Sequence, residues 1–252
     1  MLAVSQYLGW RLELPVEFVD QIPWQAREQQ LYAGQIEIGW ICGLPYVVQA
    51  DTPDPPLALL AAPVMLGTRY ADQPQYFSDV VVRRDRHYRT FEDLRGASWA
   101  YNEPHSHSGY NLTCYNLACL GETSGFFGQV LEAGSHQAAL EMVLSGQVAA
   151  SAIDSTVLEI ELARRPELND LLRVIEAWGP SPIPPLVTHR SLPAELHSRL
   201  QKLLLGMHQE DSGRSLLASL GLRRFAEVSD QDYDPIRRMA RRAAQVELGK
   251  WH

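Results

Sequence analysis

The chain has 252 residues, of which 46% are hydrophobic and 21% charged, the balance of an ordinary folded protein. This length allows one large domain or two small ones. The net charge of −8 argues against nucleic-acid binding, which requires a basic surface, but it leaves room for an anionic ligand at a locally positive site.

The first residues, MLAVSQYLGWRLEL, predict an amphipathic helix with Val4, Leu8 and Leu12 along one stripe. They lack the basic region, apolar stretch and cleavage site of a secretory signal. No apolar run approaches the roughly 20 residues of a membrane span, so we expect no membrane insertion. From the sequence alone, either the protein is cytoplasmic or its natural start lies upstream of Met1.

Along the rest of the chain, short apolar runs alternate with segments that have the periodicity of amphipathic helices. The predicted strands are residues 16–19, 36–41, 57–64, 79–83, 98–101, 149–153, 172–177 and 186–189. The predicted helices are residues 24–32, 108–120, 136–144, 155–164, 194–208 and 235–247. This alternation predicts an α/β fold with mixed, mostly parallel sheets.

Two extended segments predict two lobes. Residues 67–78 lack helical patterning, and the prolines of PSPIPP, residues 180–185, hold the backbone extended. We therefore predict a discontinuous lobe I from residues 1–77 and 183–252, and an inserted lobe II from residues 78–182, which has a normal domain size. The two crossing segments would form a hinge.

The most informative segment is WAYNEPHSHSGYNL, from Trp99 to Leu112. An apolar strand ends near Tyr101, and a helix then opens with Ser106, His107, Ser108 and Gly109. A helix N-terminus attracts anions through its free N–H groups and its dipole, and the hydroxyls and imidazole add donors. Gly109 would let a ligand approach the backbone closely. A simple serine N-cap is the alternative interpretation.

Two further strand-to-helix junctions carry polar residues. Ser135 and His136 open the helix of AGSHQAAL, and Asp154 follows the apolar run in SAIDSTVLE. His136 alone is also consistent with an exposed imidazole, and Asp154 with a helix cap. Because ligands gather at the carboxyl ends of parallel strands, the three junctions together predict one binding site.

Other chemistries compete for these residues. Ser106 or Ser108 with His136 and Asp154 suggests a hydrolase, but no GxSxG motif is present, and we predict no enzyme. His105, His107, His136 and Asp154 suggest a metal site. The three cysteines lack zinc-like spacing, and no motif predicts a cofactor.

From about Val4 onward, the sequence resembles the phosphate/phosphite/phosphonate-binding family of ABC-transporter substrate-binding proteins. The resemblance rests on EPHSHSG at 103–109, AGSH at 133–136, SGQVA at 145–149, and Phe225 followed by SDQDYDPI at 229–236. It implies a two-lobed, type II periplasmic-binding-protein fold that closes on a small oxyanion, a periplasmic location, and ABC permease subunits as partners. We expect such a binding protein to be a monomer.

The resemblance also implies roles for individual residues. Ser106, His107 and Ser108 would hold oxyanion oxygens with Gly109 beside them, and His136 would contact the anion from the next junction. Tyr46 in GLPYV would enter the cleft from lobe I, and Asp154 would receive an amino group or a protonated oxygen.

The sequence also departs from the family pattern. His107 replaces the usual threonine, and Trp40 stands near Tyr46, where smaller residues are usual, so Trp40 would also line the pocket. The family's first strand has no counterpart here. A cytoplasmic ligand-sensing protein, or an orphan binding protein of the same fold, is therefore the alternative function.

Overall fold

A computed structural model describes residues 2–249 and divides the chain into two compact units. Unit 1 comprises the residues up to Gln75 and Pro182–Tyr233, and unit 2 comprises Tyr76–Ser181 and the residues from Asp234 onward. The chain therefore passes between the units three times, whereas the sequence led us to expect two crossings. Among the described residues, no helix combines the length and the apolarity that crossing a membrane requires.

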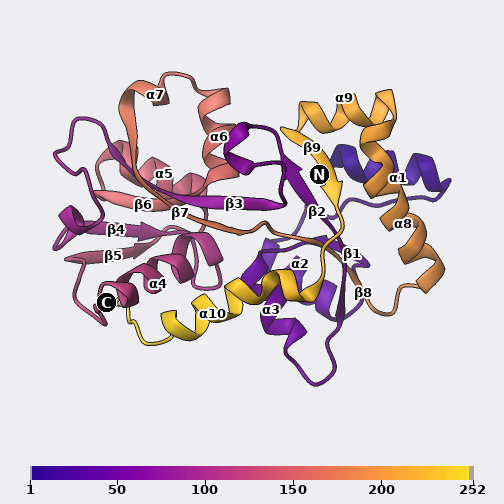
Figure 1. The fold of residues 1–252 in the computed structure, drawn as a ribbon, viewed down its shortest axis with the longest axis horizontal. Helices are drawn as coiled ribbons and strands as arrows, with labels where there is room; N and C mark the ends of the chain where they lie inside the picture. The colour runs from indigo at the N-terminus through magenta and orange to yellow at the C-terminus, as the bar shows by residue number, and fades with distance from the viewer. Residues whose placement is uncertain (1, 250–252) are drawn as a thin grey trace. The chain divides into compact units, whose positions relative to one another are not determined.

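Unit 1 is built on a four-stranded sheet in the order β1-β8-β2-β9 (Figure 1). Its strands are β1 (Ile38–Trp40), β2 (Leu57–Met65), β8 (Leu186–His189) and β9 (Leu222–Ala226). Its helices are α1 (Leu2–Leu12), α2 (Trp24–Tyr32), α3 (Gly43–Ala50), α8 (Ala194–Gly206) and α9 (Asp211–Ser219). The neighbouring strands pair antiparallel, with Leu59 opposite Val187 and Pro63 opposite Phe225. The amphipathic helix α8 packs on β2 and β9 through the buried Leu200 and Leu204.

Unit 2 contains a five-stranded sheet in the order β5-β4-β6-β3-β7. Its strands are β3 (Gln75–Arg83), β4 (Ser98–Tyr101), β5 (Gln129–Glu132), β6 (Ala150–Asp154) and β7 (Leu172–Pro182). Strand β4 runs parallel to both β5 and β6, whereas β3 is antiparallel to β6. The carboxyl ends of β4, β5 and β6 therefore lie at one edge of the sheet, the edge at which β3 begins.

Helices cover both faces of the unit 2 sheet. They are α4 (Leu112–Cys119), α5 (His136–Ser145), α6 (Ser155–Arg164), α7 (Leu168–Leu171) and α10 (Asp234–Ala243). Successive side chains of a strand point to opposite faces, and β4 shows this alternation. Trp99 joins an aromatic core with Phe91, Phe127 and Trp178, whereas Ala100 joins the aliphatic core that α5 and α6 cover.

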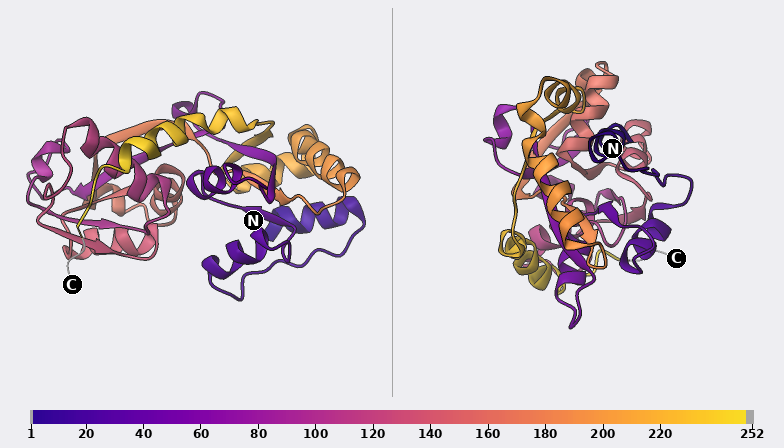
Figure 2. Two further views of the ribbon diagram at one scale, coloured as in Figure 1. Left: turned by 90° about the horizontal axis from the view of Figure 1, so that it is seen from below. Right: turned by 90° about the vertical axis from the view of Figure 1, so that its right-hand side faces the viewer.

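The C-terminal segment belongs to unit 2 rather than to the lobe predicted for it. Helix α10 lies against α4 and appears in yellow in Figures 1 and 2. Its buried Ala243, and Val246 and Leu248 beyond it, join the same core as Trp99. The sequence-based boundary missed this return because segments without helical patterning mark only the first two passages of the chain.

Most predicted elements are present, often to the residue. The strand predicted at 16–19 is wrong: residues 14–17 are exposed, and this segment forms no strand. Strands β5 and β9 and the helices α3, α7 and α9 were not predicted. The sheets are mixed, as predicted, with more antiparallel pairing than expected because the paired strands of unit 1 are antiparallel.

Candidate functional site

The first helix opening follows β4 and has an uncommon geometry. Residues His107–Asn111 form a π-helical turn, η3, which continues directly into α4. Ser106 caps this turn: its Oγ accepts a hydrogen bond from the Gly109 N–H at 3.1 Å, and its carbonyl accepts from the Asn111 N–H at 3.0 Å. π-Helical turns are rare in proteins, and many of them lie at functional sites. Ser106 is therefore a helix N-cap, as the alternative interpretation of this segment expected, and Ser108 lies on the same turn.

The second helix opening meets the first through side chains. Ser135 caps α5 by accepting from the Ala138 N–H at 3.1 Å, which fixes His136 on the first turn. His136 Nε2 lies 2.9 Å from Ser108 Oγ, and Ser108 Oγ lies 3.5 Å from Ser106 Oγ. Two junctions that are 28 residues apart in sequence therefore share one cluster of polar atoms.

Gly109 has a packing role that the sequence did not reveal. A Cβ at this position would lie 2.0 Å from Asn102 Oδ1 and 3.3 Å from His136 Cε1. The glycine therefore makes room for Asn102 and His136, and the approach of a ligand to its backbone stays a prediction. Among the described residues, Asn102 Oδ1 and His136 Nδ1 are buried polar atoms without a hydrogen-bond partner. Buried polar atoms of this kind are uncommon and call for an explanation.

The third junction lies beside the first two. Asp154 ends β6 opposite Ser78 of β3, and Ser78 Oγ donates to the Ser108 carbonyl at 2.8 Å. The Asp154 carboxylate caps α6, since its Oδ1 accepts from the Thr156 N–H at 2.8 Å and from the Thr156 hydroxyl at 2.7 Å. Ser78 therefore links the junction of β6 to the helix opening after β4.

Burial controls the electrostatics of this edge. It lowers the pKa of His107 to about 3 and that of His136 to about 4, so both imidazoles are neutral near pH 7. His136 as a residue is partly exposed, but its Nδ1 is fully enclosed. Burial also raises the pKa of Asp154 to about 6; the neighbouring Asp79 adds to this rise, and hydrogen bonds from Thr156 oppose it. No lysine or arginine is among the buried residues of the described chain.

His107 differs from its two serine neighbours because both of its ring nitrogens are already engaged. Nδ1 lies 2.9 Å from Asn111 Nδ2, and Nε2 lies 3.2 Å from Ser181 Oγ. The side chain is completely buried. Its nitrogens therefore bond to side chains inside unit 2, although the sequence suggested that they face a ligand.

The two predicted site residues of unit 1 also form hydrogen bonds within the protein. Tyr46 on α3 is buried, its hydroxyl lies 2.9 Å from Asp230 Oδ1, and its ring packs edge-on against Tyr233 with centroids 4.9 Å apart. Trp40 at the end of β1 is 40% exposed and donates from Nε1 to the Pro184 carbonyl at 2.7 Å. The C-terminal motif that contains Asp230 and Tyr233 thus serves to hold Tyr46 in place.

The metal interpretation finds no support at these residues. Within the part of the chain that the structure describes, no group of three or more histidine, cysteine or acidic side chains is arranged to hold a metal ion. His105 is exposed, and the nitrogens of His107 already bond to Asn111 and Ser181. The histidines thus have separate environments rather than a common centre.

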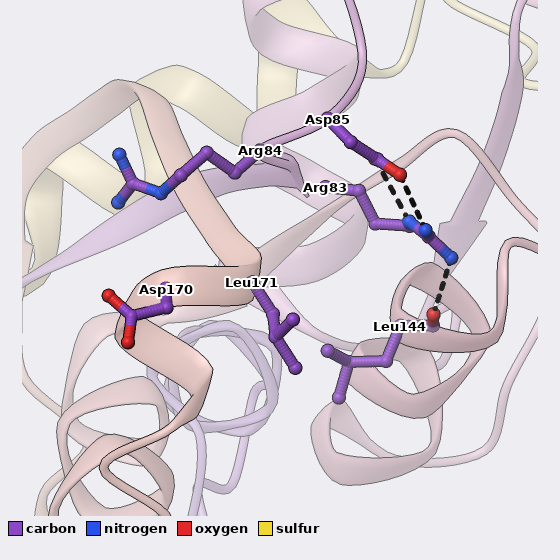
Figure 3. A pocket seen from close by; sticks show the side chains of 6 residues that line it. All are labelled: Arg83, Arg84, Asp85, Leu144, Asp170 and Leu171. Carbon is purple, nitrogen blue, oxygen red and sulfur yellow. Dashed lines mark hydrogen bonds and ion pairs between the residues drawn. The ribbon is translucent and has the colours of Figure 1, made fainter.

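A hollow of about 160 Å³ lies at the opposite edge of the unit 2 sheet (Figure 3). Its lining includes Arg83, Leu144 and Leu171, with Arg83 paired to Asp85 at 2.6 Å. None of the predicted site residues contributes to it. The register explains the separation, since Val82 pairs with Ala150 at the start of β6 and Ser78 with Asp154 at its end.

Comparison with known proteins identifies the family. Residues 1–233 match the family described as "ABC transporter, phosphonate, periplasmic substrate-binding protein". The chain belongs to this family. It is therefore a periplasmic-type substrate-binding protein of ABC transport, with the α/β fold of type II periplasmic binding proteins.

Solved structures agree with this fold. A binding-protein component of an ABC phosphonate transporter from Pseudomonas aeruginosa superposes with a TM-score of 0.81 at 20% identity, covering 93% of this chain and 78% of that one. PhnD1 from Prochlorococcus marinus, solved in complex with methylphosphonate, gives 0.83 at 19% identity, covering 97% and 92%. A protein from Xanthomonas citri bound to ATP gives 0.72 at 14% identity, covering 97% and 91%. At these identities the likeness concerns the fold of the binding protein.

Proposed function

We propose that this binding protein captures a small phosphorus oxyanion for an ABC importer and holds it where β4, β5 and β6 end. The supporting observation is the meeting of two helix openings through Ser108 and His136 at 2.9 Å, beside a buried His136 Nδ1 that has no partner in the described chain. Helix N-termini bind anions without a fixed cation, because their N–H groups already point at the ligand.

Each residue of the site has a distinct role in this proposal. Ser106 and Ser108 donate hydroxyl hydrogen bonds to oxyanion oxygens. His136 stays neutral until the anion arrives, and its Nε2 bonds to Ser108. A local movement that uncovers the enclosed Nδ1 then lets this nitrogen donate to the ligand. An adjacent anion favours the protonated imidazole, so binding raises the pKa of His136 above its low starting value. Asp154 accepts a hydrogen bond from an amino group or a protonated oxygen.

We also propose that the protein acts by binding alone, in the periplasm, with ABC permease subunits as partners. A serine hydrolase requires an acidic residue that orients the histidine, whereas Asp154 is engaged with Thr156 and His136 Nδ1 bonds to no acid among the described residues. We therefore expect no turnover of ester or phosphomonoester substrates.

The test is calorimetric titration of the purified chain with phosphate, phosphite, methylphosphonate, 2-aminoethylphosphonate and sulfate. We expect selective binding of at least one phosphorus oxyanion. At a hundred times its dissociation constant, that ligand adds about 2.7 kcal/mol to the free energy of unfolding. Absence of binding to every phosphorus oxyanion would contradict the proposal.

His136→Ala should weaken binding by about tenfold or more, since it removes a donor to a charged group that is worth about 1.5–3 kcal/mol. His87→Ala is the matched control, because His87 is exposed and lies beyond the opposite end of β3. We expect wild-type affinity from the control. Equal affinities for both variants would remove His136 from the site.

A further inference from the structure

His107 stands between the two serines of the proposed anion site but faces away from it. The imidazole is completely buried, with Nδ1 at 2.9 Å from Asn111 Nδ2 and Nε2 at 3.2 Å from Ser181 Oγ. An amide nitrogen can only donate, so Nδ1 is the acceptor of this pair. Nε2 therefore carries the proton and donates to the Ser181 hydroxyl.

The residues around His107 have a special place in the chain. Tyr76 is the residue at which the chain enters unit 2, and Ser181 is the residue at which it first leaves. Ser181 accepts from the imidazole, and the Tyr76 ring lies 6.5 Å from it between centroids. One side chain thus contacts both ends of the inserted segment.

We infer that His107 is a positioning residue that holds the anion-binding turn, Ser106–Gly109, against Tyr76 and Ser181 at the points where the chain enters and leaves unit 2. The inference rests on the proposed function, since it assumes that this turn binds the anion. Through the His107–Ser181 bond, an anion that orders the turn also orders the two passages of the chain.

Two substitutions separate the two hydrogen bonds of the imidazole. In His107→Gln, the side-chain amide nitrogen takes the place of Nε2 and can still donate to Ser181. In His107→Asn, the shorter side chain can still accept from Asn111, but it cannot reach Ser181. Both replacements are uncharged and polar, so they differ mainly in the bond under test.

Calorimetric titration with methylphosphonate and with phosphite measures the effect. We expect His107→Gln to bind within about threefold of wild type, and His107→Asn and Ser181→Ala each to bind about tenfold more weakly, the cost of one buried hydrogen bond. The double variant His107→Asn/Ser181→Ala should be no weaker than either single variant, because the two residues form one bond.

Amide hydrogen exchange supplies a readout that a loss of stability alone would not move. In wild type, methylphosphonate should slow exchange at residues 76–78 and at Ser181, and it should do so much less in His107→Asn and Ser181→Ala. Equal affinities for His107→Gln and His107→Asn, or wild-type behaviour of Ser181→Ala, would overturn the inference. If His107→Asn does not fold, Ser181→Ala alone decides.

The His136→Ala variant separates this inference from the proposed function. If His136→Ala loses binding while Ser181→Ala and His107→Asn keep it, the anion site stands and the positioning role fails. If His136→Ala binds as wild type, the proposed site itself is wrong, and the inference falls with it.

Discussion

Asp154 combines two effects that oppose each other at neutral pH. The carboxyl group is 8% exposed, and burial raises its pKa to about 6, while its Oδ1 caps α6 through Thr156. In the unfolded chain this group has a pKa near 3.8. The folded state therefore takes up the proton more readily, and Asp154 makes the protein more stable as the pH falls from 6 towards 4.

Asp154→Asn should stabilise the protein at neutral and alkaline pH. The amide keeps an oxygen that accepts from Thr156 but removes the buried charge, so the free energy of unfolding should rise by about 2–3 kcal/mol at pH 8. At pH 5 the folded carboxyl is mostly protonated but the unfolded one is still ionised, so the gain should fall to about half, and it should largely vanish only near pH 4. Chemical denaturation at the two pH values measures the difference.

Asp170→Asn is the control for the substitution at Asp154. Asp170 is exposed at the opposite edge of the sheet, so the same loss of charge should change stability little at either pH. An equal loss of stability in Asp154→Asn at pH 8 and pH 5 would show that the ionised cap is needed and that burial does not penalise it.

The site residues that the sequence predicted in unit 2 lie at helix openings, where local patterns carry information. Ser106, Ser108, His136 and Asp154 each follow a strand and begin a helix, and the register of the sheet brings them to one edge. The residues that were missed act over long distances in sequence. Ser78 reaches Ser108, and Ser181 reaches His107 across 74 residues. No local pattern marks such contacts.

At the scale of elements, the π-helical turn η3 depends on close packing against the end of β4. A Cβ at Gly109 would lie 2.0 Å from Asn102 Oδ1, closer than atoms can approach without displacement. Asn102 itself is held by the Gly134 N–H, which donates to its carbonyl at 2.7 Å. The turn and the strand end must therefore move apart if position 109 carries a side chain.

Gly109→Ala should lower the free energy of unfolding by about 1–3 kcal/mol, the usual cost of overpacking, and should weaken anion binding as the turn shifts. In Gly109→Ala/Asn102→Ala the obstructing oxygen is gone, so much of the stability should return. Thermal denaturation with and without methylphosphonate measures both effects.

Gly206→Ala is the matched control for the element. This glycine ends α8, and a Cβ there would contact nothing within 4 Å. Alanine is the better helix former, so the control should be neutral or more stable by up to about 1 kcal/mol. A Gly109→Ala protein as stable as this control would show that the packing at the turn is loose.

The elements that the sequence predicted are those with a strong local period. Helices α2 and α6 and strands β4 and β8 coincide with their predictions to the residue. Strands β5 and β9 were missed because their exposed residues Gln129 and Arg223 interrupt short apolar runs. Residues 16–19 alternate like a strand, but pairing requires a partner strand, and local sequence does not supply one.

At the scale of the whole molecule, the C-terminal segment makes unit 2 discontinuous. The family match ends at residue 233, yet Ala243, Val246 and Leu248 lie in the core that contains Trp99. The Glu247 N–H also donates to the Thr123 carbonyl at 2.8 Å, which ties the segment to the loop after α4. The part of the chain beyond the family match therefore completes the unit that carries the proposed site.

A chain that ends at Tyr233 should consequently lose more than its last helix. Each buried aliphatic side chain contributes about 1.5–3 kcal/mol, so removal of Val246 and Leu248 with α10 takes a large part of the roughly 5–15 kcal/mol that stabilises a domain. Because α10 packs on α4 and on η3, the anion-binding turn should loosen first. We expect faster amide exchange across α4 and loss of methylphosphonate binding.

Two single variants are the controls for the truncation. Leu248→Ala should show a milder form of both effects, and Arg241→Ala, at an exposed position, should show neither. Wild-type affinity in the truncated chain would mean that residues 1–233 fold without this support and that the segment is an appendage to unit 2 rather than part of its core.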